Sequence, residues 1–225
     1  FSALETAGAV VLTQGAGNFA TQGNAIVFTD VQALYKGQAV SATGRVVTGA
    51  DNAKTLDFSV RMPSGDPAVI LNGLQAGGPL AVEATLTGSA LAPILAGNFS
   101  FASLPFGDMT VNSINGAFSY AGQTLLLSDV SGSMAGGAVS AEGEVYPDTG
   151  RFSLGISGSG LDSSRLTTKD VKGPLSLSGT AAGDAAGAVA QGNFVIRGAQ
   201  AYGISPLLFR GDFVLYFLSF SLVIP

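Results

Sequence analysis

Apolar and polar residues alternate along most of the chain with a period of two. In the segment 56–62, Leu-Asp-Phe-Ser-Val-Arg-Met, apolar residues occupy every second position and polar residues lie between them. The segments 82–87, 152–157, 175–178 and 194–197 follow a similar pattern. This period is that of a strand with one buried face, whereas a helix would mix apolar and polar residues on every side. The pattern predicts an all-β chain of antiparallel meanders, with a turn about every 8 to 12 residues.

Helix signals are weak. The segment 89–96 carries Pro93, and the alanine-rich segment 181–191 is interrupted by two glycines. Both residue types disfavour a helix interior, so we expect loops there, with at most one short turn. A single helical turn is expected within 161–172, before the sequence Gly173-Pro174.

A stretch that reads as three short strands punctuated by glycines occurs twice. Residues 17–46 and 116–145 align without a gap at a step of 99 positions, and 12 of the 30 aligned residues are identical. Two further phrases, Gly78-Pro79-Leu80 and Gly97-Asn98-Phe99, recur 95 residues later. A repeated supersecondary unit predicts an elongated protein in which each unit packs on its neighbours.

The repeat sets the expected organisation of the chain. Residues 1–16 are interpreted as the end of a preceding unit, 17–115 and 116–210 as two full units, and 211–225 as the beginning of a third. The hydrophobic run at the end departs from the repeat, and we interpret the residues after about 215 as a non-native tail; a genuine terminal strand is the alternative. Because the chain begins at Phe1 and carries no signal peptide, we expect it to be a fragment of a longer protein.

Composition excludes several classes of function. Charged residues make up 11% of the chain and apolar residues 47%, so the chain is too apolar to be disordered. The net charge of −5 comes without the clustered Lys and Arg that nucleic acid requires, so no nucleic-acid partner is expected. The chain has no His and no Cys, which removes the usual catalytic triads and the commonest general base and metal ligand. We therefore expect a non-enzymatic protein without a cofactor or metal.

Acidic residues are the remaining candidates for chemistry. A Ca²⁺ or acid/base cluster could be imagined from Asp129, Glu142, Glu144, Asp148 and Asp162. However, Glu142 and Glu144 share the polar face of one expected strand, and Asp148 lies in a Pro-Asp-Thr-Gly turn, where Asp bonds to its own backbone. We interpret these acids as solvated strand faces and turns.

Several phrases resemble the AsmA-like/TamB superfamily of bacterial envelope proteins. They are the Gly-x-Phe strands and the segments 129–143, 156–162 and 78–97, and the resemblance covers most of residues 9–215. It implies a long twisted β-sheet curled into a groove with an apolar interior. It also implies a periplasmic lipid conduit, anchored in the inner membrane, that carries phospholipid towards the outer membrane and has an outer-membrane assembly protein as a further partner. The anchor and the terminal module of that family are not among these residues.

The resulting prediction is an elongated, repetitive antiparallel sheet curled into an open groove, with a closed β-sandwich or β-solenoid as the alternative. The predicted function is a segment of a phospholipid conduit; the alternative is a structural or adhesive surface protein. A second apolar layer over the strands would favour the closed alternatives, and an open apolar face would favour the groove. The residues expected to line the groove are Leu56, Phe58, Val60, Val82, Leu86, Phe118, Val139, Phe152, Leu154, Ile156, Leu175, Leu177, Phe194 and Ile196.

Overall fold

The computed structural model describes residues 3–5, 11–70, 76–106, 109–166, 170–184, 186–201 and 203–217. Nearly all of them lie in strands, so the all-β prediction is confirmed. The elements are β1 (Ala3–Glu5), β2 (Val11–Gln22), β3 (Ala25–Tyr35), β4 (Gln38–Thr48), β5 (Lys54–Gly65), α1 (Pro67–Ile70), β6 (Leu80–Ser89), β7 (Ala92–Phe106), β8 (Met109–Ala121), β9 (Thr124–Met134), β10 (Gly137–Tyr146), β11 (Arg151–Asp162), the 3₁₀ turn η1 (Ser163–Arg165), β12 (Val171–Lys172), β13 (Pro174–Asp184), β14 (Gly187–Ala201) and β15 (Ile204–Phe217).

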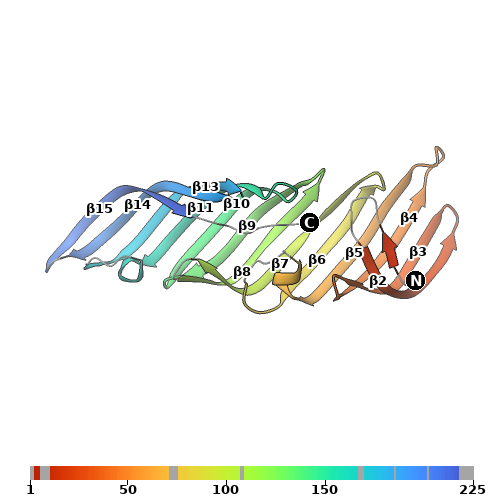
Figure 1. Ribbon diagram of the computed structural model, residues 1–225, viewed down its shortest axis with the longest axis horizontal. Helices are drawn as coiled ribbons and strands as arrows, with labels where there is room; N and C mark the ends of the chain where they lie inside the picture. The colour runs from red at the N-terminus through yellow and green to blue at the C-terminus, as the bar shows by residue number, and fades with distance from the viewer. Residues whose placement is uncertain are drawn as a thin grey trace.

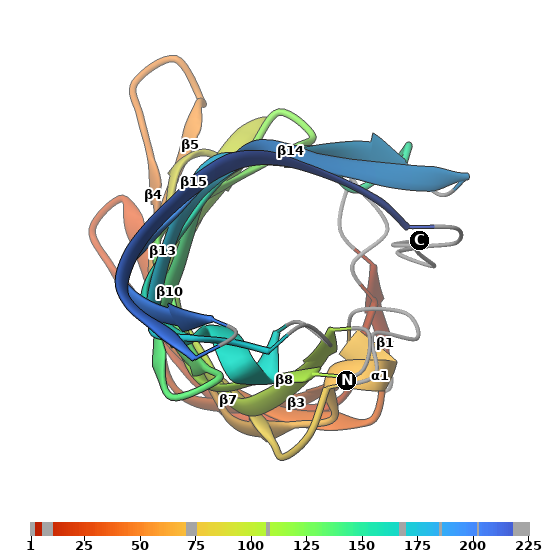
Figure 2. The same ribbon diagram turned by 90° about the vertical axis from the view of Figure 1, so that its left-hand side faces the viewer.

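The strands form one 15-stranded sheet in which nearly every strand pairs with the next in sequence. The described pairings are antiparallel, and the two-residue β12 lies along β14 beyond the end of β13. The sheet is elongated along the direction of strand addition (Figure 1). Viewed along this axis it curls into a C-shaped cross-section that is open on one side (Figure 2). The prediction of an elongated, curled and open antiparallel sheet is therefore confirmed.

The period-two pattern gives each strand a half-buried apolar face and an exposed polar face. In β4, β5 and β13, half-buried and exposed residues alternate along most of the strand. The helix α1 lies on the inner side of the curl (Figure 2). Its Ile70 packs against the apolar cluster of Met62, Leu80, Phe101 and Ile114. The apolar face is therefore the concave one.

The backbone repeats with the step seen in the sequence. Positive φ angles occur at Gln14, Asp30 and Lys36, and again 99 residues later at Ser113, Asp129 and Ala135. The β3–β4 ladder shifts register between Phe28 and Val31, and the β10–β9 ladder shifts at the equivalent place, across Asp129. An extra residue of this kind is a β-bulge, which bends the strand and increases its twist. Both copies therefore bend at matching positions.

The glycines fall into two classes that the sequence did not separate. Gly37, Gly122 and Gly136 lie in two-residue hairpin turns whose central residues both have positive φ, as type I′ turns require. Gly116 and Gly143 instead lie inside long strands. The expectation of short strands ending at glycines was wrong here, because glycine suits both a turn and a crowded position between bent strands.

Two segments expected to be loops are strands. Residues 89–96 belong to the β6–β7 hairpin and 181–191 to the β13–β14 hairpin. Proline has no backbone N–H to donate. At Pro93 this removes no hydrogen bond to β8, because the β7–β8 ladder begins only at Leu95. The alanines of the second hairpin face one another, as in the pair Ala181 and Ala190.

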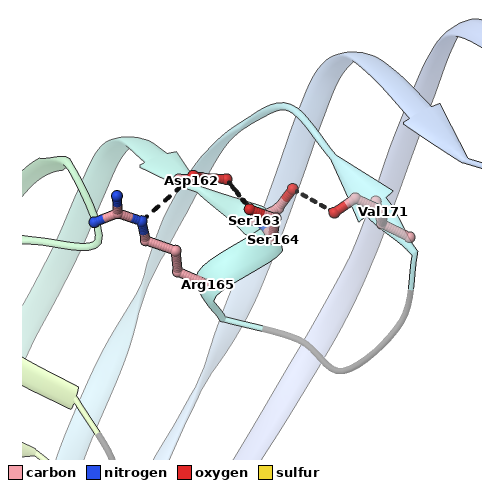
Figure 3. Close-up of polar contacts among 5 residues, drawn as sticks. All are labelled: Asp162, Ser163, Ser164, Arg165 and Val171. Atoms are coloured by element: carbon pink, nitrogen blue, oxygen red, sulfur yellow. Dashed lines mark hydrogen bonds and ion pairs between the residues drawn. The ribbon is translucent and has the colours of Figure 1, made fainter.

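The helical turn expected within 161–172 is confirmed as η1. Asp162 caps it by accepting hydrogen bonds from the Ser164 backbone N–H at 3.0 Å and the Ser164 hydroxyl at 2.7 Å (Figure 3). The Ser163 hydroxyl is fully buried and donates to the Val171 carbonyl at 3.0 Å. In the other repeat, α1 follows β5 as η1 follows β11, and the sequence analysis missed it.

The end of the chain is described only as far as Phe217. Residues Leu215, Tyr216 and Phe217 pair with Ala190, Val189 and Ala188 and so continue β15. The rest of the proposed non-native tail, 218–225, lies outside the described residues.

Candidate functional site

The candidate site is the concave apolar face, formed by the inward-facing residues of the curled sheet. The register places all fourteen predicted groove residues on it: Phe58 lies opposite Leu86, Leu177 opposite Phe194, and Leu175 opposite Ile196. The central strands extend the same ladder, because Leu154 and Phe152 lie opposite Gly143 and Val145. The face therefore continues from strand to strand across both repeats.

This face is only partly covered. Thirteen of the fourteen residues are half-buried, and Ile196 alone is buried, with 5% of its surface exposed. Among the described strands all belong to the one sheet, so no second sheet packs over the face. The buried cluster that α1 helps to cover contains Met62, Leu80, Phe101 and Ile114 and lies locally beside that helix. Over the rest of the face the described apolar side chains are only partly buried.

Aromatic rings that the prediction left out join this face. The ring of Phe28 lies 6.4 Å from Phe19 and 5.7 Å from Phe58, and the ring of Phe99 lies 6.1 Å from Phe101 and 6.5 Å from Phe118. Phe99 was recognisable by its Gly-x-Phe motif, and its ladder partner Val82 was already predicted to face the groove. Phe28 pairs with Phe19 and Gly44, which were not predicted, so it could be found only by extending the alternation to β3. These clusters give the groove a wide, hydrophobic and partly aromatic floor.

Charged and polar side chains lie on the opposite, convex face. Arg45 pairs with Asp57 at 3.0 Å and Arg61 with Glu83 at 3.1 Å, and all four side chains are exposed. Hydroxyl ladders continue this face, with Ser140 and Ser157 at 2.7 Å. Exposed pairs of this kind add little to stability. The ion pairs and hydroxyl groups make the outer surface hydrophilic, while the inner surface is apolar.

The acidic candidates of the sequence do not converge. Glu142 and Glu144 alternate with inward residues on β10, Asp129 forms the β9 bulge and Asp148 lies in a turn. Within the described part of the chain, no three acidic side chains are grouped as metal ligands.

Two of these acids form hydrogen bonds with neighbouring side chains, and these contacts shift a pKa. The Ser164 hydroxyl and backbone N–H, with a smaller contribution from Arg165, hold the pKa of Asp162 below its usual value. The Glu144 carboxylate accepts a hydrogen bond from the Tyr146 hydroxyl and thereby raises the pKa of Tyr146. These are local contacts and do not form a reactive centre.

A hollow of about 720 Å³ lies between β3 and β7. Most of its lining side chains belong to the convex face, including Ser41, Ser59, Arg61, Glu83 and Asn98. Its lining also includes Val60 and Ala84 from the inward-facing rows, so residues of both faces border it.

Comparison of the chain with protein-family models, with curated proteins and with solved structures finds no match. No helix in the described ranges is long and apolar enough to cross a membrane.

Proposed function

We propose that this chain is a segment of a lipid conduit, in which the concave apolar face holds phospholipid acyl chains. The observation that supports this most directly is the incomplete burial of that face: a single curled sheet presents a continuous row of Leu, Phe, Val and Ile side chains that are only partly buried. Soluble monomers rarely leave apolar surface of this extent open to water. A ligand that covers the face removes the unfavourable free energy of exposing this apolar surface to water.

Acyl chains suit the chemistry of the face. Burial of apolar surface is worth about 0.8 kcal/mol per CH₂ group, and the charged pairs Arg45–Asp57 and Arg61–Glu83 belong to the convex surface. A ligand that required hydrogen bonds would find few partners along the ladder of Leu154, Gly143 and Ala181. A chain held only by non-directional contacts has no fixed position and can slide.

The dimensions also suit this use. The two-residue β12 only extends the row of β13, so strands spaced about 4.8 Å apart make this sheet at least about 60 Å long. The hydrocarbon core of a bilayer, about 30 Å, holds two acyl chains end to end. The groove is thus long enough for several lipids in file, with headgroups in water on the open side of the C. The direction of movement must come from a gradient or from partners.

The resemblance to the AsmA-like/TamB superfamily supports a further proposal about location. In that setting the groove works in the bacterial periplasm, between the inner and outer membranes, and supports outer-membrane biogenesis. Its partners are then phospholipids and an outer-membrane assembly protein.

Polar ladders on the convex face support one alternative. Ser140–Ser157 and Ser178–Asn193 are side-chain pairs of the kind found on structural or adhesive β-repeat proteins. Such a protein has no use for bound lipid, so the test below separates the two functions.

The experiment is site-specific crosslinking combined with mass spectrometry of the purified chain. A photoreactive phenylalanine analogue at Leu154, on the concave face, is expected to capture phospholipid. The same analogue at Ser153, the next residue along β11 but exposed on the convex face, is the matched control. Leu154→Asp is expected to reduce co-purifying phospholipid at least fivefold, while Ser153→Asp leaves it unchanged. Equal lipid recovery from a folded Leu154→Asp variant, or equal crosslinking at both positions, would contradict the proposal.

A further inference from the structure

The sheet has two long rims with different connections. Because the strands form an antiparallel meander, successive connections alternate between the rims. The connections with α1 and η1 lie on one rim, here called the helix rim, and both helical turns lie on the inner side of the curl (Figure 2). The opposite rim carries short hairpin turns, such as those of β6–β7 and β8–β9, and is called the hairpin rim. The concave face is accordingly divided into a helix half and a hairpin half.

The helix α1 is fixed to the neighbouring β3–β4 turn. The Lys36 ammonium donates a hydrogen bond to the Ile70 carbonyl at 3.3 Å, and the Gln38 side-chain oxygen accepts one from the Asp66 backbone N–H at 3.1 Å. The helix is therefore held at both of its ends. Met62, in the cluster against which Ile70 packs, keeps only 6% of its surface exposed. This part of the helix half is thus already covered by the chain itself.

The turn η1 is held at the equivalent place in the second repeat. The Asp162 backbone N–H donates to the Ala135 carbonyl at 2.9 Å, and Ala135 lies 99 residues after Lys36. Leu161 and Ser163, on either side of Asp162, are fully buried. Both repeats therefore carry an anchored helical turn over the same half of the concave face.

Burial follows the same division of the face. Among the described residues, eleven of the fourteen buried hydrophobic side chains lie in the helix half, and the exceptions are Val145 and the alanines 188 and 190. In the hairpin half, the inward-facing Tyr120 keeps 36% of its surface exposed, and its ladder partners Leu95 and Leu125 are only partly buried. A bound acyl chain gains free energy only by covering apolar surface that is still exposed. The hairpin half offers such surface, and the helix half offers little.

One row of inward residues crosses the hairpin half from strand to strand. Each member lies directly opposite the next in the ladder, and none of them is charged. From β5 to β11 the row consists of Phe58, Leu86, Leu95, Tyr120, Leu125, Val145 and Phe152. It follows the direction in which strands are added to the sheet (Figure 1), and at about 4.8 Å per strand it is about 29 Å long. The row is therefore about as long as two acyl chains end to end.

We propose that lipid acyl chains run along this row in the hairpin half, while the helix half is a packed layer that supports the sheet and does not contact lipid. This inference rests on the lipid function proposed above and locates the binding surface within the groove. It removes Leu175 and Ile196, which lie in the helix half, from the residues that touch a ligand. The anchored turns α1 and η1 keep the acyl chains on the hairpin side in both repeats.

Photocrosslinking at two positions of one strand tests the location. A photoreactive phenylalanine analogue replaces either Tyr120, in the hairpin half of β8, or Val111, in the helix half of the same strand and packed against the cluster under α1. The purified chain is incubated with vesicles of equal parts dioleoyl-phosphatidylethanolamine and dioleoyl-phosphatidylglycerol, illuminated and analysed by mass spectrometry. We expect at least fivefold more lipid adduct at Tyr120. At Val111 the analogue should instead crosslink to the chain itself, because protein atoms surround it.

A second pair of positions guards against a local disturbance at Val111. Phe152 lies in the row, and Leu175 lies in the helix half, and both side chains are half-buried. The same excess of lipid adduct is expected at Phe152. Equal lipid capture in the two halves, at both pairs of positions, would overturn the proposed location while leaving the lipid function in place. Absence of lipid adducts at all four positions would overturn both proposals.

Discussion

Single residues shape this sheet chiefly where a glycine leaves no room for a side chain. A Cβ atom at Gly192 would overlap the carbonyl oxygen of Ser178 on the neighbouring strand. At Gly155 the nearest atoms to such a Cβ are those of Glu142, at 3.7 Å and beyond. Gly192 is therefore required by packing between strands, and Gly155 is not.

Alanine substitutions are expected to separate the two glycines. Gly192→Ala forces β13 and β14 apart and should lower the free energy of unfolding by about 1–3 kcal/mol. Gly155→Ala meets no clash and restricts the unfolded chain, so it should be neutral or raise stability by about 0.4–1 kcal/mol. Urea unfolding of both variants measures the difference. Equal effects would show that inter-strand crowding does not constrain Gly192.

Tyr35 gives the fold a dependence on alkaline pH. Burial, and to a lesser extent the nearby Tyr120, raise the pKa of Tyr35 above its ordinary value of 10.0. A raised pKa means that the folded state keeps the proton longer than the unfolded state, so this contribution is fully present below pH 10 and is lost as pH rises through the folded pKa. Tyr35→Phe should therefore lose less stability than the wild type between pH 9 and pH 11 in urea unfolding. Parallel curves for the two proteins would contradict this prediction.

Strands in this molecule are bent by bulges as well as by glycines. Asp129 occupies the extra position of the β9 bulge with φ of 51°, and Asp30 occupies the equivalent position with φ of 54°. Asp is among the few residues that adopt this left-handed conformation without a large cost. The bulge restores the alternation, so Leu127 and Val130 both pair with inward residues, Gly143 and Ala141.

Substitutions at Asp129 should follow backbone preference. Asp129→Gly should change the free energy of unfolding by less than about 0.5 kcal/mol. Asp129→Val should lower it by about 1–2 kcal/mol, because a β-branched residue resists positive φ. Thermal and urea unfolding of the two variants provide the measurement. A valine variant as stable as the glycine variant would mean that the bulge has moved.

At this scale the sequence predicted much of the fold. Alternation in Leu56–Met62 fixes both the strand and its apolar side, because one-residue slips would turn every side chain over. For the same reason the fourteen groove residues were assigned to one face. The hairpin at 181–191 was missed because alanine and glycine carry little periodic signal. The turn α1 was missed because its four residues depend on packing against Met62 and Leu80.

The openness of the groove could not be predicted from any strand alone. It depends on curvature accumulated across the whole sheet, which is set by bulges such as those at Asp30 and Asp129 and by the ladder registers. A flat sheet with the same alternation could have packed against a second sheet. The sheet instead curls into an open C (Figure 2), so the apolar faces of its strands share the inner side.

The whole molecule should therefore be longer and less compact than its chain length suggests. A compact domain of this size would have a radius of gyration of about 17 Å. An open sheet at least about 60 Å long contributes about 18 Å through its length, and strands about 40 Å long, curled into a C, raise the radius of gyration to roughly 20–21 Å. Small-angle X-ray scattering of the monomer measures this quantity. A value near that of a compact globule would mean that the groove folds back on itself in solution.

Strand order has a consequence for how the molecule is made. Because nearly every strand pairs with the one synthesised just before it, the contacts are close in sequence, and no late segment has to be threaded between earlier ones. Such proteins fold by extension from a local nucleus, and N-terminal parts fold first during synthesis. The groove can therefore lengthen hairpin by hairpin as the chain leaves the ribosome. Each finished edge then serves as the template for the next strand.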